Sequence, residues 1–416
     1  MIRKLFTNAH IVTPYDPGVP LSGKHQEELH HFKKGALLCK NGIIEAVGNE
    51  EKIKASLVPH DVDLEVDCGG SCLIPGFVDP HTHMCFARRR EEEFTLRIEG
   101  KEYLDILHQG GGILSSVHEV RAASEEELFS MTQRHALSAL QSGTTTLEIK
   151  SGYGLDTETE IKMLRVIERV GRETPLDVIP TFLGAHAVPE EYAKSPDMYV
   201  DLVIQEMIPA VSNQGIAQFC DVFCEKNVFS IDQARIILQT ARKNGLGLKI
   251  HADEVYDLGG AGLAAELNAT SAEHLLSASD QNLYAMAQKG VIGVLLPGTA
   301  YSLQKGYAHA RKMVELGVPI ALATDCNPGS SYTESMPFIF GLAVFNMNLS
   351  ISEALVAATL NAAYSVRMEK KAGSLESGKF ADFLIIDGEG PAILAYHAGV
   401  CPVVEVYKRG ELVARD

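Results

Sequence analysis

The chain has 416 residues, of which 46% are hydrophobic and 22% charged, and it contains no tryptophan. This composition excludes a disordered, collagenous or low-complexity protein, and the length allows an α/β barrel together with a smaller domain. The formal net charge of −17 argues against a nucleic-acid-binding surface, which needs clustered basic side chains, so an anionic ligand would need basic residues supplied locally.

The eight cysteines are scattered and lack the paired C-x-x-C spacing of a structural zinc site. We therefore expect them to be reduced and mostly buried. Polar residues interrupt the apolar sequence within the first eight residues, too early for the apolar region of a signal peptide. No apolar run approaches the roughly 18 residues of a membrane span. We expect a cytoplasmic protein with neither a membrane nor a nucleic acid as partner.

The first 75 residues read as short strands, at residues 5–13, 36–39 and 43–47. Asn41-Gly42, between the last two, is a strong signal for a two-residue hairpin turn of type I′. Residues 18–34 carry His25, His30 and His31 in polar sequence without periodicity. This segment is more typical of a solvated loop than of a metal site.

The middle of the chain alternates short apolar runs with stretches of helical periodicity, the pattern of repeated βα units. Eight candidate strands end near His83, Glu148, Gly184, Glu225, His251, His274, Leu296 and Asp325. Helices are expected between them, for example at residues 157–170, 232–243 and 277–288. An eight-stranded (β/α) barrel is the architecture that uses every one of these elements.

The C-terminus returns to strands, at residues 383–386, 403–408 and 411–413, with a turn at Arg409-Gly410. Both ends of the chain are therefore expected to form one small domain. The predicted fold is α/β: a (β/α)8 TIM-like barrel at residues 76–368, with a small β-sandwich domain composed of residues 1–75 and 369–416.

Metal-type side chains occupy the ends of the candidate barrel strands, where the reacting groups of such barrels lie. His81 and His83 are two residues apart, so on an extended strand they point the same way. One such residue alone is more often a hydrogen-bonded core residue. Five at strand ends are expected to converge on one mouth of the barrel: His81, His83, His251, His274 and Asp325.

Nitrogen and oxygen donors without a thiolate suit zinc or iron, and an open ligand position would hold a water of lowered pKa. This chemistry predicts a hydrolytic site. Glu254 lies three residues beyond His251 and is a candidate for proton transfer. The alternative is a carboxylate that caps the next helix.

A barrel with Asp-Pro-His-Thr-His on its first strand, histidines on the fifth and sixth and an aspartate on the eighth resembles the amidohydrolase superfamily. Within it, four stretches closely resemble the imidazolonepropionase family: Glu-Ile-Lys-Ser-Gly-Tyr-Gly (148–154), His-Ala-Asp-Glu (251–254), Ala-Thr-Asp-Cys-Asn-Pro-Gly-Ser (323–330) and Thr-Glu-Ser-Met (333–336). The resemblance spans almost the whole chain.

This resemblance implies hydrolysis of the ring amide of 4-imidazolone-5-propanoate to N-formimidoyl-L-glutamate, in histidine degradation, by a homodimer with one zinc or iron ion per chain. The implied metal ligands are His81, His83, His251 and Asp325. The implied substrate contacts are Arg90, Tyr103, Tyr153, His186, Glu254, Asn327, Gly329 and Ser330.

Local chemistry supports several of these roles. Arg90 offers a two-pronged guanidinium for the substrate carboxylate, although Arg88 and Arg89 in the same run remain alternatives. As catalytic residues we expect Glu254 to manage protons and Asp325 both to bind the metal and to orient or deprotonate its water. His274 would stabilise the oxyanion or share the proton.

Three other interpretations stay open at this point. Glu225, at the end of the fourth candidate strand, could support a second metal ion. A ring deaminase of the same superfamily would share the ligands but release ammonia. A metal-free relative could act as a scaffold, although every expected ligand is present here.

Overall fold

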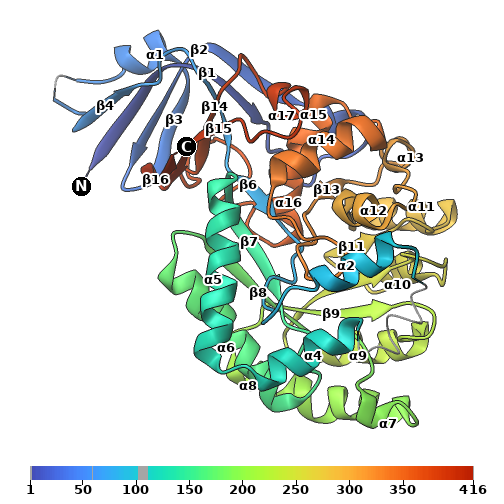
Figure 1. Cartoon of the computed structure of the whole chain (residues 1–416). Coiled ribbons are helices and arrows are strands. Elements are labelled where there is room, and N and C mark those ends of the chain that lie inside the picture. The colour runs from blue at the N-terminus through green and yellow to red at the C-terminus, as the bar shows by residue number, and fades with distance from the viewer. Residues whose placement is uncertain (1, 59, 102–110, 416) are drawn as a thin grey trace.

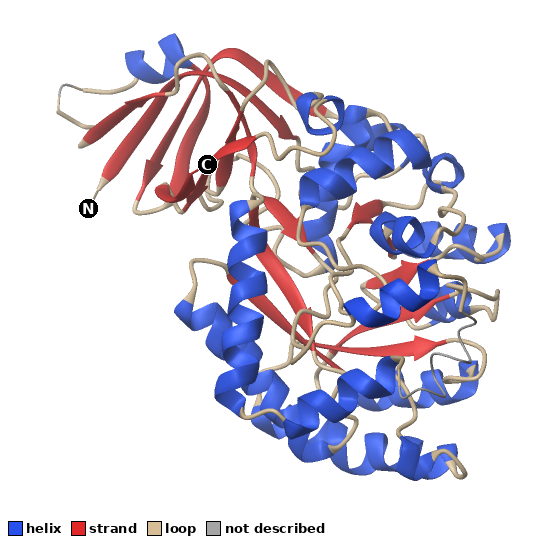
Figure 2. Cartoon of the chain, in the orientation of Figure 1, coloured by secondary structure: helices blue, strands red, loops and turns tan. Residues whose placement is uncertain are grey.

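The structure, a computed structural model, describes residues 2–58, 60–101 and 111–415, and consists of two sheets with surrounding helices (Figure 1). Both chain ends lie in the smaller sheet, while the larger sheet is wrapped by helices (Figure 2). The predicted barrel with a small β domain built from both termini is confirmed. The exact domain boundaries at residues 75/76 and 368/369 remain predictions.

The smaller sheet has the strand order β16-β15-β14-β5-β1-β2-β3, with β4 also paired to β1. Its strands are β1 (Arg3–Pro14), β2 (Leu29–Lys40), β3 (Ile43–Asn49), β4 (Leu64–Asp67), β5 (Cys72–Pro75), β14 (Phe383–Ile386), β15 (Val403–Lys408) and β16 (Glu411–Arg415). Antiparallel pairing of β5 with β14 joins the two ends of the chain. The ring of Phe383 stacks on Tyr407 and meets Phe6 edge-on, which gives this sheet its own aromatic core.

The hairpin predicted at Asn41-Gly42 is confirmed, since both residues have positive φ and β2 pairs with β3 around them. The loop predicted at residues 18–34 is wrong in its second half. Residues 29–34 belong to β2, where His31 pairs with Val12 of β1. Their side chains are largely exposed, so backbone hydrogen bonds hold this part of the strand and no burial pattern marks it in the sequence.

The larger sheet has eight parallel strands in sequence order, from β6 to β13. They are β6 (Phe77–Asp79), β7 (Thr144–Lys150), β8 (Asp177–Ala185), β9 (Phe219–Cys224), β10 (Gly247–Ala252), β11 (Ser271–His274), β12 (Ile292–Leu295) and β13 (Ile320–Leu322). The backbone N–H of Asp325 donates to His81, and that of His83 donates to Cys326. These bonds connect the first strand region with the last and place the predicted ligands side by side.

Two strands end earlier than the sequence indicates. β6 stops at Asp79, because Pro80 has no N–H to continue the ladder, and His81 and His83 follow outside the strand. β13 stops at Leu322, three residues before Asp325. The predicted ligands His81, His83 and Asp325 therefore lie just beyond these strand ends.

Most of the described helices lie around the barrel, although the first of them packs against β2 and β3 of the smaller sheet. They are α1 (Glu50–Ala55), α2 (Glu91–Ile98), α4 (Ile113–Ala122), α5 (Glu125–Gln141), α6 (Thr157–Glu173), α7 (Pro196–Leu202), α8 (Ile208–Gln214), α9 (Ile231–Lys243), α10 (Gly260–Glu266), α11 (Asp280–Lys289), α12 (Pro297–Leu303), α13 (Ala310–Leu316), α14 (Met336–Met347), α15 (Ile351–Ala358), α16 (Leu360–Ser365) and α17 (Ile393–Tyr396). Two short 3-10 turns, η1 (Gly23–Glu27) and η2 (Glu190–Tyr192), and a π-helical turn, η3 (Val203–Met207), complete the structure. Helix α6 shows the usual logic: Met163, Ile167 and Val170 are buried, and Asp156 caps its first turn.

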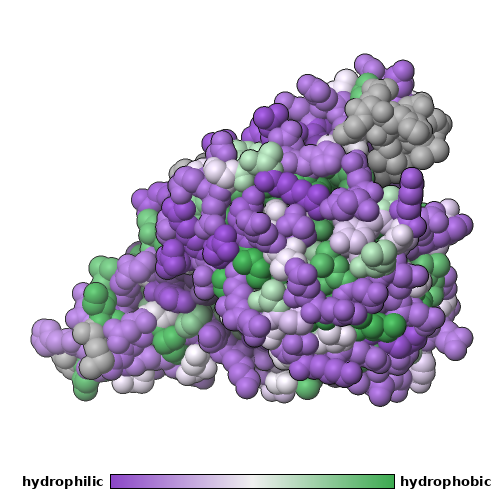
Figure 3. All heavy atoms as spheres, turned by 90° about the horizontal axis from the view of Figure 1, so that it is seen from below, coloured by the Kyte–Doolittle hydropathy of each residue, from purple (hydrophilic) through white to green (hydrophobic). Residues whose placement is uncertain are grey.

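The surface seen in Figure 3 is mostly hydrophilic, with apolar side chains in separate groups. Within the described residues, no helix is long and apolar enough to cross a membrane. Seven of the eight cysteines are buried, as predicted, and Cys401 is exposed. Burial raises the pKa of the Cys85 thiol to about 12, so this side chain behaves as a small apolar group.

Candidate metal centre and active site

Four of the predicted donors converge at the mouth of the barrel. The Nε2 atom of His83 lies 3.3 Å from Nε2 of His81 and 3.3 Å from Nε2 of His251. Oδ1 of Asp325 lies 3.5 Å from His81 Nε2 and 3.4 Å from His83 Nε2. All four side chains are buried. Residues 244 positions apart in the chain are thus brought to one point.

The spacing of these donors fits a divalent metal ion. Ligands at the corners of a tetrahedron, each about 2.0–2.1 Å from a zinc-like ion, lie roughly 3.3–3.4 Å from one another. Burial lowers the pKa of the His81 and His83 imidazoles well below the usual range. The positive charge of Lys150 lowers the pKa of His81 further, and His186 lowers that of His83. Both rings are therefore neutral and ready to donate a lone pair.

Asp325 is aimed by its neighbours. The hydroxyl of Thr299 donates to Oδ2, which leaves Oδ1 facing the histidines. The residue itself adopts a left-handed conformation, with φ of 52°, as does His274 at 71°. Such backbone conformations are costly for non-glycine residues and cluster at functional sites.

A carboxylate behind the metal centre holds His251. Oδ2 of Asp221, in β9, lies 3.0 Å from Nδ1 of His251 and 2.9 Å from Nζ of Lys150. Burial by itself would lower the pKa of His251, but the Asp221 carboxylate raises it above its ordinary value. Burial opposes the charge on Asp221 too, yet His251 and Lys150 hold its pKa well below the usual range.

Lys150 belongs to a layer of fully buried charges beneath the ligands. Its ammonium lies 2.9 Å from Glu148 Oε1, and Nζ of Lys249 lies 3.3 Å from the same oxygen and 3.7 Å from Glu273 Oε1. Uncompensated charges of this kind would be very costly in a barrel core. Here each cation has at least one carboxylate within contact, so neither ammonium is left unpaired.

Glu225, the sequence-based candidate for a second metal ion, points elsewhere. Its two carboxylate oxygens accept the backbone N–H groups of Lys226 and Val255 at 2.7 and 2.9 Å.

Among the described residues, the other acidic and imidazole cluster is His81, Asp221 and Glu273. The ammonium of Lys150 already contacts Asp221 there, which supplies a positive charge within the protein itself.

Glu254 and His274 stand beside the metal centre. Nε2 of His274 lies 3.8 Å from Oε2 of Glu254, and the His274 ring centre is 5.4 Å from that of His251. Both side chains are largely buried. The structure therefore places the two predicted proton-handling groups next to each other, with His274 beside His251.

The predicted aromatic contacts also gather here. The ring of His186 stacks on His83 with centres 4.8 Å apart, and Tyr153 lies 5.4 Å from His186. Nδ1 of His186 donates to the carbonyl of Gly152, and burial lowers the pKa of His186 to about 3. Gly152 has φ of 104°, and a Cβ there would lie 2.9 Å from a backbone oxygen. Only glycine suits this turn.

The three consecutive arginines separate in the structure. Arg88 is 73% exposed in its side chain and pairs with Glu119, and Arg89 stacks over the ring of Tyr332. Arg90 is half-buried and lies against Gly329. This arrangement favours Arg90 as the substrate-facing guanidinium. Tyr103, another predicted contact, lies outside the described residues.

Asn327 organises the loop that follows Asp325. Its Oδ1 accepts the backbone N–H groups of Gly329 and Ser330 at 2.8 and 2.7 Å, and its Nδ2 donates to the Asp325 carbonyl at 2.7 Å. These bonds support a role in shaping the loop. Direct contact of Asn327, Gly329 or Ser330 with substrate stays a prediction.

Sequence reasoning missed several residues that shape the site, namely Asp221, Lys150, Thr299 and Glu160. Glu160 accepts the backbone N–H groups of Gly152, Gly154 and Leu155 and so holds the Tyr153 loop. Charged residues inside otherwise apolar strands, such as Asp221 in Phe-Cys-Asp-Val-Phe-Cys, were the available signal. A charge in a core strand requires a buried partner.

Comparison with known proteins agrees with this geometry. Residues 72–413 match the Amidohydrolase family. The chain is 66% identical to an imidazolonepropionase of Syntrophobacter fumaroxidans, over 98% of this chain and 96% of that protein. It is 60% identical to an imidazolonepropionase of Desulfotalea psychrophila, over 99% of this chain and 100% of that protein.

Solved structures show the same fold at low sequence identity. Guanine deaminase of E. coli aligns with a TM-score of 0.77 at 14% identity, covering 100% of both chains. A triazine hydrolase variant aligns with a TM-score of 0.74 at 16% identity, covering 99% of this chain and 95% of the other. The sequence match to full-length relatives is far more specific, and by it the chain belongs to the imidazolonepropionase family of the amidohydrolases.

Proposed function

We propose that this chain hydrolyses the ring amide C–N bond of 4-imidazolone-5-propanoate, giving N-formimidoyl-L-glutamate in the degradation of histidine. The observation that carries the proposal is the convergence of His81, His83 and His251 in one donor cluster, with Oδ1 of Asp325 3.5 and 3.4 Å from the first two. It occurs in a chain that is 66% identical to an imidazolonepropionase.

These four side chains would hold one divalent ion, which we propose to be zinc or iron because the donors are imidazole nitrogens and a carboxylate oxygen without a thiolate. When bound, such an ion polarises a carbonyl and lowers the pKa of a water molecule toward neutrality. Asp325 accepts from Thr299 through Oδ2 and keeps Oδ1 on the metal side. This fixed carboxylate orients the attacking water and can take its proton.

The remaining chemistry falls to the residues around the ion. Water adds its oxygen to the ring carbonyl carbon, the C–N bond breaks, and a proton must reach the leaving nitrogen. Glu254 carries that proton, and His274, with Nε2 3.8 Å from the Glu254 carboxylate, stabilises the developing oxyanion or shares the proton. The neutral ring of His186 stacks on His83, and the Tyr153 ring lies 5.4 Å from His186.

Substrate selection would depend on Arg90, whose guanidinium pairs with the propionate carboxylate in a protein of formal charge −17. Tyr103, Tyr153, His186, Glu254, Asn327, Gly329 and Ser330 complete the proposed set of substrate contacts. Family membership also underlies our proposal of a homodimer, which analytical ultracentrifugation tests.

The test is incubation of purified, metal-loaded protein with 4-imidazolone-5-propanoate. Loss of the substrate's ultraviolet absorbance should accompany appearance of N-formimidoyl-glutamate, without free ammonia. Stoichiometric ammonia would favour a ring deaminase, the activity named for some structural neighbours. Absence of turnover by metal-loaded protein would reject the proposed function.

A further inference from the structure

Arg90, which we propose to bind the substrate carboxylate, already has a carboxylate partner within the protein. Its Nε and Nη2 atoms donate to the two oxygens of Glu93 at 2.9 and 2.6 Å. Both side chains are mostly buried, with 16% and 19% of their surface exposed. This pairing occupies only the side edge of the guanidinium, between Nε and Nη2.

The outer end of the guanidinium remains available. Among the described residues, no hydrogen bond involves Nη1 of Arg90. This atom lies close to Gly329, where a Cβ would approach it to 2.5 Å. Gly329 has no positive φ, so a Cβ there would displace the arginine end without straining the backbone. The bare glycine leaves space for the arginine end.

Glu93 is itself held in place by the next helix. The backbone N–H of Gly112 donates to both carboxylate oxygens at 3.1 Å, and the hydroxyl of Ser115 donates to Oε1 at 3.2 Å. Burial raises the pKa of Glu93, but the Arg90 guanidinium together with the hydrogen bonds from Gly112 and Ser115 lowers it overall. The ionised carboxylate therefore connects the start of α4 with Arg90.

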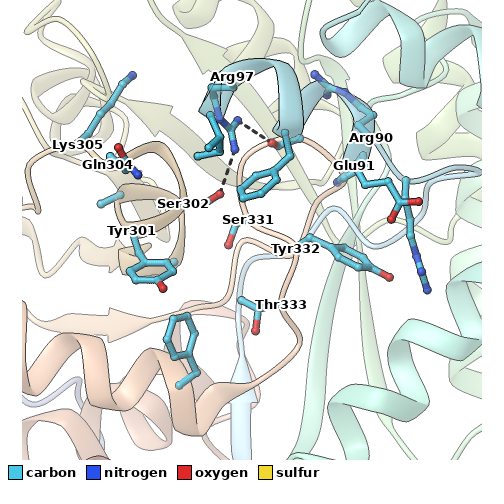
Figure 4. Close-up of a pocket in the computed structure, with 18 of the residues that line it drawn as sticks. Arg90, Glu91, Arg97, Tyr301, Ser302, Gln304, Lys305, Ser331, Tyr332 and Thr333 are labelled. Carbon is cyan, nitrogen blue, oxygen red and sulfur yellow. Dashed lines mark hydrogen bonds between the residues drawn. The ribbon is translucent and has the colours of Figure 1, made fainter. Parts of the chain in front are cut away.

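A second arginine adds positive charge on the other side of Gly329. Nη1 of Arg97, in α2, donates to the Gly329 carbonyl at 3.1 Å and Nη2 donates to Ser302 at 3.3 Å (Figure 4). Two guanidinium groups thus flank one glycine, and Glu93 pairs with the first of them. A cavity of about 640 Å³ opens here, lined by both arginines and Lys305. The local charge favours an anion although the chain is acidic.

We propose that Glu93 is a positioning residue for substrate selection: it holds the side edge of Arg90 so that the Nη1 end is presented, across the bare Gly329, to the substrate carboxylate. The inference rests on the proposed function. It adds that the two parts of the guanidinium have different partners: the edge with Nε and Nη2 pairs with Glu93, and the Nη1 end binds the ligand. An arginine without Glu93 would not be held in this way.

Replacing Glu93 with Gln distinguishes positioning from simple neutralisation, because the two roles predict opposite effects. If Glu93 only competed for the guanidinium, its loss would strengthen binding of an anion and lower KM. If it positions Arg90, Glu93→Gln should raise KM roughly tenfold, the effect of losing about one charge-assisted hydrogen bond, while kcat changes little.

Glu92→Gln is the matched control. Glu92 is an exposed neighbour in the same helix, so its replacement changes the net charge equally without touching Arg90. A substrate analogue with a propanamide in place of the propanoate gives a second readout. Its KM should be high with every variant and insensitive to Glu93→Gln, whereas a general structural defect would impair both substrates alike.

Arg90→Lys separates failure of this inference from failure of the proposed carboxylate contact. If Arg90→Lys raises KM but Glu93→Gln leaves it unchanged or lowers it, Glu93 does not position the arginine. If Arg90→Lys leaves KM unchanged while the substrate is still hydrolysed, Arg90 is not the contact, and the inference falls with it. The single variant Gly329→Ala should also raise KM, as Glu93→Gln should. A normal KM for Gly329→Ala would contradict the proposed approach of the ligand.

Discussion

Asp221 Oδ2 lies 3.0 Å from Nδ1 of His251, on the side of the ring opposite the nitrogen that faces His83. The contact orients the imidazole and raises its basicity, because a carboxylate beside Nδ1 favours positive charge on the ring. We expect Asp221→Asn to weaken metal affinity about 10- to 100-fold. Metal titration of the purified apoprotein measures this. The exposed Asp201→Asn, on α7, is the control and should bind metal normally.

Removal of a ligand should have a more drastic effect. His81→Ala is expected to lose metal and activity together, because its Nε2 is one of four donors that lie 3.3–3.5 Å from a neighbour. His274→Asn should retain the metal, since we assign that side chain no ligand role. Elemental analysis of both variants checks the assignment. Two metal ions per wild-type chain would contradict a mononuclear centre.

Glu254→Gln should preserve metal content and fold but lower kcat by roughly 10²–10⁴, the range for a general acid–base group. The glutamine keeps the shape of the side chain and cannot deliver a proton to the leaving nitrogen. Steady-state kinetics with parallel metal analysis tests this. A near-normal kcat would show that Asp325 or His274 delivers the proton instead. Loss of metal from the variant would show that Glu254 is a metal ligand.

A pH-dependent contribution to stability is expected from Glu353, far from the active site. Its buried carboxylate accepts from Arg311 and from the Ser350 N–H, which lower its pKa below the ordinary 4.5 despite the opposing effect of burial. A lowered pKa stabilises the folded state above pH 4.5, and this contribution disappears as the pH falls through the folded-state pKa.

Glu353→Gln should therefore lower Tm at pH 7 and approach the wild-type value below that pKa. Charged hydrogen bonds of this kind contribute about 1–3 kcal/mol. Calorimetry of the metal-loaded protein from pH 3 to 7 measures the difference, with the exposed Glu158→Gln on α6 as control. A Tm difference that does not depend on pH would show that packing, and not charge, is responsible.

Much of the site could be predicted from the sequence because its signals are local. His81 and His83 share a face through the two-residue period of extended chain, and His251, His274 and Asp325 end segments of strand length that alternate with helical stretches. In a barrel of parallel strands, all such ends meet at one mouth. The order of the barrel strands and the small sheet from both termini followed from the same patterns.

The tertiary structure decided what depends on partners distant in the chain. Asp221 and Lys150 can be charged in the barrel core because strands β9 and β7 bring them to 2.9 Å, and neither sequence segment indicates the other. Glu93 became part of the site only when α2 placed it against Arg90 and the start of α4. The sequence by itself determined which side chains reach the mouth, since periodicity is a property of the local backbone. Their spacing and their supporting charges came from the fold, since electrostatic energy depends on distances between strands.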